Sequence, residues 1–235
     1  MDYAEYIGRV RYWLEQAPMR LDNPKRPEEE GGLPVVFISP KMANEVLSAN
    51  GKTIEQLQKW INRKGKAKSF QTKSELVFHM KRDEEKLTAE NVLCFIEGSD
   101  PVLKNEIVVI SAHYDHIGIV NGQINNGADD DGSGTVSALE IAEAFVDAKK
   151  NGNGARRSIL ILNVSGEEKG LLGSEWYSDF PVYPLENTVC DLNIDMIGRV
   201  DTERKTADTL NYIYVVGHDK ISSELPLINE GANNK

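Results

Sequence analysis

Acidic and imidazole side chains stand at four separate points in the second half of this chain. These points are His113 with Asp115, the triplet Asp129-Asp130-Asp131, the pair Glu167-Glu168, and Asp195. Imidazole nitrogens and carboxylate oxygens are among the ligands by which proteins hold zinc. Four spaced ligand candidates, with a spare carboxylate beside them to handle a proton, predict a two-metal hydrolase.

The first point is a histidine at the end of an apolar run. A lone histidine in such a place is commonly structural, but Asp115 lies two residues further on. Its carboxylate could accept the second imidazole N–H and fix the tautomer, as outer carboxylates do for zinc-bound histidines. The pair therefore favours His113 as a metal ligand that Asp115 orients.

The acidic triplet has two interpretations. Acids ahead of Gly132-Ser133-Gly134 can serve only as a loop and a helix N-cap. Three adjacent carboxylates also repel one another, and a bound cation relieves that repulsion. If a cation binds here, we expect one aspartate to point at it and two to anchor the loop.

The remaining acids follow two other apolar runs. Glu167 and Glu168 come after Ser165-Gly166. There they either favour a helix N-terminus or divide into a metal ligand and a general base. Asp195 closes an apolar run, and a carboxylate in that place is costly to bury unless it is paired or bound to metal.

Short, β-branched apolar runs predict the strands that place these groups. They occur at 92–96, 107–112, 159–164 and 189–194, and helices are expected between them at 133–149 and 169–180. Strands that alternate with helices predict an α/β fold, with a mostly parallel twisted sheet flanked by helices on both faces. Because ligands bind beyond the carboxyl ends of such strands, the imidazole and the carboxylates should meet at one edge.

The first 89 residues have a different pattern. The expected elements are an amphipathic helix at 3–16, a proline-rich loop at 18–34, short strands at 35–39 and 76–80, and a helix from Pro40 to about Ala49. Thr53 and Gln56 form a capping-box signature for a second helix. The basic residues at 62–68 predict a surface turn, and the alternation across 76–80 places His79 on an exposed face.

Composition narrows the classes of function. The formal net charge of −10 over 235 residues argues against nucleic-acid or anionic-membrane binding. The sequence contains no run of about 18 apolar residues and no basic start followed by an apolar stretch, so neither a transmembrane segment nor a signal peptide is expected in this chain. Cys94 and Cys190 stand in apolar runs and are interpreted as buried free thiols.

Together these motifs resemble the di-zinc aminopeptidase and carboxypeptidase family of bacterial leucyl aminopeptidases and glutamate carboxypeptidase-like enzymes. Four segments carry the resemblance: Ser-Ala-His-Tyr-Asp-His-Ile-Gly at 111–118, Asn-Gly-Ala-Asp-Asp-Asp-Gly-Ser-Gly at 126–134, Ser-Gly-Glu-Glu-Lys-Gly-Leu-Leu-Gly-Ser at 165–174 and Asn-Ile-Asp-Met-Ile-Gly at 193–198. The blocks occur in the family's order and span about residues 90–218.

The resemblance implies a fold of the zinc exopeptidase type and a role for each site residue. The implied metal ligands are His113 and Asp195 for one zinc, Glu168 for a second, and Asp130 as the bridge between them. Glu167 would be the general base, and Asp115 would orient His113. The implied reaction is hydrolysis of the N-terminal peptide bond of a peptide or protein by a zinc-bound hydroxide.

One ligand of the family pattern has no match in this chain. It is the final histidine of the second zinc, which in the family lies after further strands, and the chain is therefore interpreted as truncated at its C-terminal end. Within the chain, His116 beside a glycine turn and His218 after an apolar run are the alternatives. The sequence sets neither the side-chain preference nor the oligomeric state.

The resemblance also suggests an organisation and leaves other functions open. Residues 1–89 would form an N-terminal region with a partial protease-associated-like insert, and residues 90–235 an incomplete zinc peptidase domain. The family implies export to the periplasm or the cell exterior. A catalytically inactive binding module and a single-zinc enzyme like glutaminyl cyclase are the alternatives, although the His113–Asp115 pair favours a peptidase.

Overall fold

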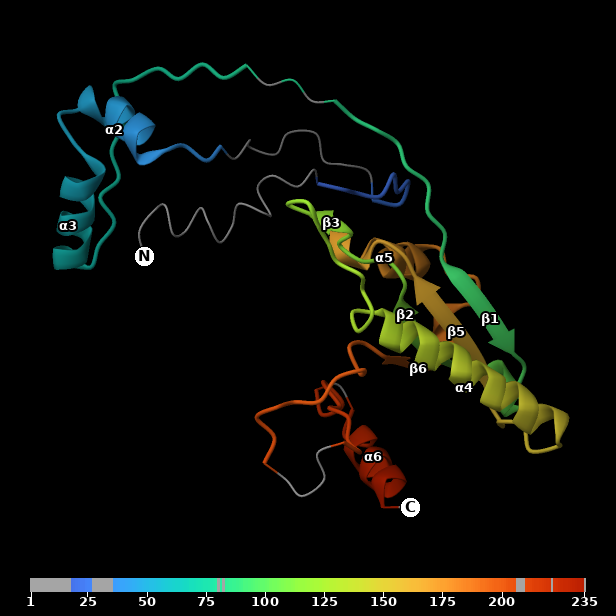
Figure 1. The fold of residues 1–235 in the computed structure, drawn as a ribbon. Helices are drawn as coiled ribbons and strands as arrows, with labels where there is room; N and C mark the ends of the chain where they lie inside the picture. The colour runs from blue at the N-terminus through green and yellow to red at the C-terminus, as the bar shows by residue number, and fades with distance from the viewer. Residues whose placement is uncertain are drawn as a thin grey trace. The chain divides into compact units, whose positions relative to one another are not determined.

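The structure is a computed structural model that describes residues 18–26, 36–79, 81, 83–205, 210–220 and 222–234 (Figure 1). The chain divides into two compact units, Met1–Thr88 and Ala89–Lys235. This division lies one residue from the boundary expected between 89 and 90, and the insert in the first unit stays a prediction. The helix expected at 3–16 lies outside the described residues. Every described helix is too short or too polar to cross a lipid bilayer.

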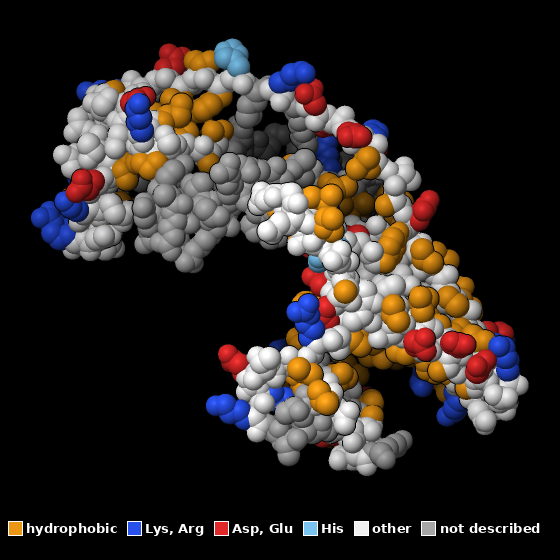
Figure 2. Space-filling view, viewed as in Figure 1, with side chains coloured by type: hydrophobic (Ala, Val, Ile, Leu, Met, Phe, Trp, Pro, Cys, Tyr) orange, Lys and Arg blue, Asp and Glu red, His pale blue; other side chains and the backbone are white. Residues whose placement is uncertain are grey.

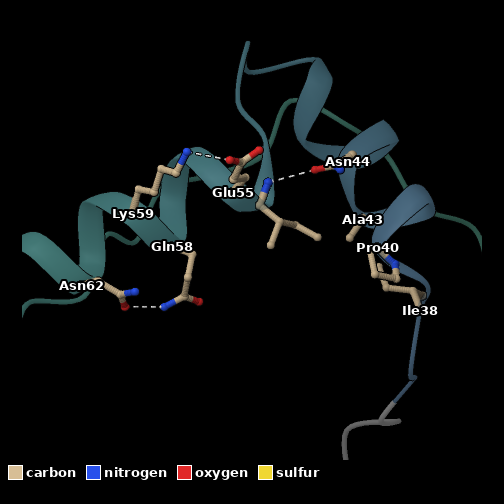
Figure 3. Close-up of a pocket in the computed structure, with 9 residues that line it drawn as sticks. Ile38, Pro40, Ala43, Asn44, Glu55, Gln58, Lys59 and Asn62 are labelled. Carbon is tan, nitrogen blue, oxygen red and sulfur yellow. Dashed lines mark hydrogen bonds and ion pairs between the residues drawn. The ribbon is translucent and has the colours of Figure 1, made fainter. Parts of the chain in front are cut away.

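Two helices in the first unit begin at the residues that the sequence indicated. Helix α2 (Pro40–Ser48) follows Ser39, whose side chain accepts a hydrogen bond from the Met42 amide. Helix α3 (Ile54–Lys64) follows Thr53, which forms the complete capping box with Gln56. A pocket lies between the two helices, and Asn44 accepts a hydrogen bond from the Ile54 amide beside it at 2.9 Å (Figure 3).

The two strands expected in the first unit are absent from its described residues. Residues 36–39 and 76–79 have no regular secondary structure, while Val35 and Met80 lie outside the described part. An alternating pattern makes a strand only where a partner supplies the inter-strand hydrogen bonds, and the described sheets pair only strands of the second unit. His79 is exposed, as expected, and the first residues of the predicted basic turn belong to α3.

A four-stranded sheet organises the second unit. Its order is β1 (Val92–Ile96), β5 (Ser158–Val164), β2 (Ile107–His113) and β6 (Thr188–Asn193). Strand β2 runs parallel to both β5 and β6, whereas β1 is antiparallel to β5. A small hairpin of β3 (Ile119–Val120) and β4 (Gln123–Ile124) follows β2.

Helices cover both faces of this sheet, so the predicted α/β fold is confirmed. Helix α4 (Gly132–Lys150) packs on one face, where Ala138 joins a core with Ile110 and Ile161. Helix α5 (Leu172–Asp179) packs on the other, where Tyr177 contacts a core formed around Leu160. The remaining elements are the short 3-10 helices η1 (Leu103–Asn105), η2 (Glu167–Lys169) and η3 (Leu185–Asn187) and the helix α6 (Leu225–Asn233).

The two cysteines are free, as expected, but they are not deeply buried. Cys94 is exposed and Cys190 is half-buried. Both lie on edge strands of the sheet, β1 and β6, where fewer neighbouring elements cover the side chains. On the face shown in Figure 2, the coloured Lys and Arg side chains are interspersed with Asp and Glu.

Candidate metal centre

The carboxyl ends of three parallel strands meet at one edge of the sheet. His113 is the last residue of β2, Glu167 opens η2 shortly after β5, and Asp195 follows β6. Hydrogen bonds continue the pairing beyond the strands, since the Tyr114 amide donates to the Val164 carbonyl and the Ile194 amide to the Ser111 carbonyl. The candidate residues are therefore positioned by the most extensively paired part of the fold.

One group of ligand atoms surrounds the His113 ring, which is only 3% exposed. Its Nε2 lies 3.1 Å from Asp130 Oδ1 and 3.9 Å from Asp195 Oδ2. Glu167 Oε2 is also 3.9 Å from this nitrogen. His113, Asp130 and Asp195 each offer one ligand atom to a position where all three atoms lie within 4.8 Å of one another.

The hydrogen bonding of His113 leaves a lone pair directed at these carboxylates. Its Nδ1 is 3.1 Å from the carbonyl oxygen of Asp115, which can only accept, so Nδ1 carries the proton. In the neutral ring Nε2 is then an acceptor, and it has no hydrogen-bond partner among the described residues. An acceptor facing carboxylate oxygens is unfavourable unless a cation lies between them, so these residues fit a zinc ion.

Asp115 contacts both parts of the centre. We expected its carboxylate to accept the second imidazole N–H, but His113 Nδ1 instead donates to the Asp115 carbonyl oxygen, and the carboxylate lies 3.8 Å from that nitrogen. The two carboxylate oxygens accept hydrogen bonds from the amides of Glu167 at 3.1 Å and Glu168 at 3.3 Å. Asp115 therefore holds the turn that carries both glutamates, in addition to its contact with His113.

The outer members of the acidic triplet are bound by backbone amides. Asp131 is 1% exposed, and its carboxylate accepts hydrogen bonds from the amides of Gly134, His113 and Met196 at 2.9–3.3 Å. It is also the N-cap of α4. Asp129 accepts a hydrogen bond from the Gly198 amide at 2.8 Å.

Helix α4 starts very close to the segment after β6. A Cβ atom at Gly134 would lie 2.3 Å from the Ile194 carbonyl oxygen and 2.4 Å from the Asp131 carboxylate, so only glycine fits there. Asp129 and Asp131 thus anchor the loop to its surroundings, and Asp130 is the member of the triplet whose carboxylate reaches His113.

A second group of ligand atoms shares Asp130 with the first. It consists of His116, Asp130 and Glu168, again with all three atoms within 4.8 Å of one another. Neither group contains His218, the other histidine that the sequence offered as an alternative. The two candidate ligand groups therefore share one carboxylate, that of Asp130.

The charges of the centre shift the protonation of two of its members. Burial raises the pKa of Glu167, the positive charge that His113 can carry lowers it, and the neighbouring carboxylates of Glu168 and Asp195 raise it further, with a net increase. Burial lowers the pKa of His113, but the carboxylates around the ring outweigh this effect and the net direction is upward. Both directions belong to the metal-free centre, because a bound cation would add its own positive charge beside these groups.

Comparison with known proteins agrees with this geometry. The model of Peptidase family M28 matches residues 91–224. A probable leucine aminopeptidase of Trichophyton verrucosum is 39% identical over 106 residues, 43% of this chain and 29% of that protein. A probable zinc metalloprotease of Pyrenophora teres f. teres is 31% identical over 143 residues, 59% of this chain and 28% of that protein.

A third relative bears a different name. A probable glutamate carboxypeptidase of Arthroderma benhamiae is 33% identical over 107 residues, 45% of this chain and 14% of that protein. The matched part thus spans less than a third of each of these curated relatives. The family match itself extends over more than half of the present sequence, from β1 to the segment before α6. The chain therefore belongs to peptidase family M28.

Proposed function

We propose that this chain carries the catalytic centre of a zinc-dependent aminopeptidase that uses two metal ions. The observation that supports the proposal best is the pair of ligand groups that share Asp130. His113 and Asp195 would hold one zinc, Glu168 would hold the other, and Asp130 would bridge them. A scaffold without catalytic function has no need for acceptor atoms brought together in this way.

Glu167 is the candidate general base because it lies beside both ligand groups and belongs to neither. Zinc in such a centre lowers the pKa of a coordinated water toward about 7 and polarises a carbonyl group. The Glu167 carboxylate accepts one proton from the water whose oxygen attacks the scissile carbonyl carbon. The same carboxyl then gives that proton to the leaving amine as the C–N bond breaks.

The preference for an N-terminal residue is the finer part of the proposal. It is supported by the relatives named leucine aminopeptidase, which are 39% identical to this chain in the matched region. The relative named glutamate carboxypeptidase, which is 33% identical in the matched region, supports the alternative, which is removal of a C-terminal residue. The substrate would be the free N-terminus of a peptide or protein, and the resemblance to exported enzymes suggests that the reaction takes place outside the cytoplasm.

Hydrolysis of aminoacyl p-nitroanilides tests this proposal. The zinc-loaded protein should release p-nitroaniline from the leucyl derivative and the N-terminal residue from an unblocked peptide. An N-acetylated copy of the same peptide is the control, because blocking the amine removes the substrate of an aminopeptidase but leaves that of a carboxypeptidase. Release of the C-terminal residue from both peptides would refute the aminopeptidase proposal.

A peptide that begins with glutamine separates the proposal from the cyclase alternative. A peptidase releases free glutamine, whereas a cyclase converts the N-terminus to pyroglutamate and leaves the chain intact. Zinc bound at the centre with no product from any peptide would instead support a non-catalytic binding module.

A further inference from the structure

The second ligand group contains a histidine to which the family pattern gives no role. His116 Nδ1 lies 2.8 Å from Glu168 Oε1, yet neither atom has a hydrogen bond to any described residue, and both are shielded from solvent. Two ligands of a tetrahedral zinc ion, each about 2.0–2.1 Å from it, lie about 3.3 Å apart. The two atoms need to separate by only about half an ångström to hold an ion between them.

The position of His116 is fixed by the loop that carries Asp130. A Cβ atom at Gly127 would lie 2.9 Å from both Cβ and Cγ of His116, so the imidazole packs directly on the glycine backbone. The Gly132 amide donates to the Gly127 carbonyl at 2.8 Å and closes that loop. The ring and the bridging carboxylate therefore belong to one packed unit, which is the preorganisation that a metal ligand needs.

Hydrogen bonds also join the two ends of the segment between His116 and Gly127. It contains the β3–β4 hairpin, and the Asn125 amide and side chain both donate to the Gly118 carbonyl, at 2.9 and 3.1 Å. This closure brings the end of the hairpin back to its start. His116 is thereby placed next to the acidic loop although ten residues separate it from Gly127 in the sequence.

We propose that His116, through Nδ1, is a ligand of the second divalent cation, together with Glu168 and the bridging Asp130. The two positions then have matching ligand sets, each with one imidazole, one terminal carboxylate and the shared aspartate. This inference rests on the metallopeptidase function proposed above, because it concerns the same centre. It goes further in giving the second ion a nitrogen ligand from the segment directly after β2.

Zinc binding to the purified chain tests the assignment. After removal of metals with a chelator, equilibrium dialysis against Zn²⁺ with elemental analysis should give two ions per chain. His116→Ala should retain the ion at His113 and weaken the other by about 100-fold or more, since even outer-shell partners contribute about 10–100-fold to metal affinity. His113→Ala should show the opposite loss. His79→Ala, which removes an exposed histidine of the first unit, is the matched control and should bind zinc as the unchanged chain does.

His116→Asn separates ligation from mere positioning of Glu168. The asparagine amide places an N–H donor near the site of Nδ1 but is a poor zinc ligand. If His116 only donated a hydrogen bond to Glu168, this variant would keep both ions with unchanged affinity. Our assignment expects it to lose the second ion as His116→Ala does.

X-ray absorption of the zinc-loaded protein gives a direct count of imidazole ligands. The expected average is one imidazole per zinc in the unchanged chain, from His113 and His116. A single ion per chain, or two ions that both survive His116→Asn, would overturn the assignment even if peptides are hydrolysed. Two ions that depend on His116 without hydrolysis of any peptide would uphold the assignment and refute the proposed function.

Discussion

Two helix N-termini of this molecule are capped by side chains that differ in how far along the chain their hydrogen-bond partners lie. Thr53 caps α3 through bonds to Gln56, three residues away, in an exposed part of the first unit. Asp131 caps α4 in the second unit, is almost fully buried, and also binds the amides of His113 and Met196. One cap is local, and the other joins the end of β2 to the segment after β6.

The difference shows how stability and function are coupled in one unit and separate in the other. The carboxylate that starts α4 stands next in sequence to Asp130, so the hydrogen bonds that fix the helix also fix the proposed metal ligand. The capping box of α3 joins Thr53 to Gln56 of the same helix. Changes around the start of α4 should therefore affect fold and chemistry together, whereas loss of the Thr53 cap should affect only the stability of α3.

The largest expected effect is on turnover, from Glu167→Gln. The amide cannot accept the proton from water, so kcat should fall by about 10²–10⁴-fold. Zinc content should stay at the level of the unchanged protein, because neither ligand group contains Glu167. Steady-state kinetics and elemental analysis of the same sample check both parts. Loss of zinc in this variant would mean that the two adjacent glutamates have exchanged roles.

Asp130→Ala should weaken both ions at once. The carboxylate belongs to both ligand groups, so its removal takes one ligand from each. Dialysis against Zn²⁺ should reveal a parallel loss of affinity at both positions, while the start of α4 remains capped by Asp131. Asp129→Asn is the comparison variant, since the Asp129 carboxylate accepts from the Gly198 amide and the asparagine oxygen can do the same. Two ions retained by Asp130→Ala would show that the aspartate is not a bridge.

Asp131→Ala sharpens the comparison of the two caps. It leaves three buried amides without their acceptor and should lower the free energy of unfolding by about 3 kcal/mol, from a lost cap and unsatisfied donors. Zinc affinity should fall as well, although Asp131 belongs to neither ligand group. Urea unfolding and zinc titration of the same protein measure the two effects. An unchanged zinc affinity would show that the Asp131 cap stabilises α4 without supporting the metal centre.

Thr53→Ala is the corresponding change in the first unit. Loss of an N-cap costs about 1 kcal/mol, so hydrogen exchange of the α3 amides should quicken by about fivefold. Zinc affinity and turnover should not change. A decrease in either would mean that the start of α3 is linked to the metal centre after all. Thr53→Ser, which keeps the hydroxyl, should restore the protection of α3.

These contrasts also explain what the sequence could predict. Apolar β-branched runs placed β1 over 92–96 and β5 to within one residue, and the capping box placed α3, because each signal is local. The strands expected at 35–39 and 76–80 failed in the described residues because strand formation depends on a partner that periodicity does not supply.

For the candidate site too, the sequence predicted the features that follow from the strands but not the contacts that depend on loops. The strand order brings His113, Glu167 and Asp195 to one edge, as the alternation of strands and helices indicated. The contact of His116 with Gly127 depends on the closure of the β3–β4 hairpin, and no spacing rule encodes that closure. The same holds for the carboxylate of Asp115, which accepts hydrogen bonds from the amides of Glu167 and Glu168, 52 and 53 residues further along the chain.

The smallest expected effect concerns a surface acid that lies in the second unit outside the metal centre. Amide donors from Leu103 and Val102 and the Arg156 guanidinium lower the pKa of Asp100 from 3.8 to about 2. Because the folded-state pKa lies below the unfolded one, the stabilisation is complete above about pH 4 and is lost as the pH falls toward 2. Asp100→Asn keeps a carbonyl oxygen for the amides but has no charge for Arg156.

The difference in unfolding free energy between the unchanged chain and Asp100→Asn should therefore be largest near neutral pH and should shrink between pH 4 and pH 2. Urea unfolding across this range measures it, with zinc kept out of the buffers so that protonation of the metal ligands does not add a second transition. Arg156→Gln should reduce the pH dependence only in part, because the two amides still favour the charged carboxylate. If the difference in unfolding free energy were the same at every pH, the hydrogen bonds, rather than the ionisation of Asp100, would stabilise this turn.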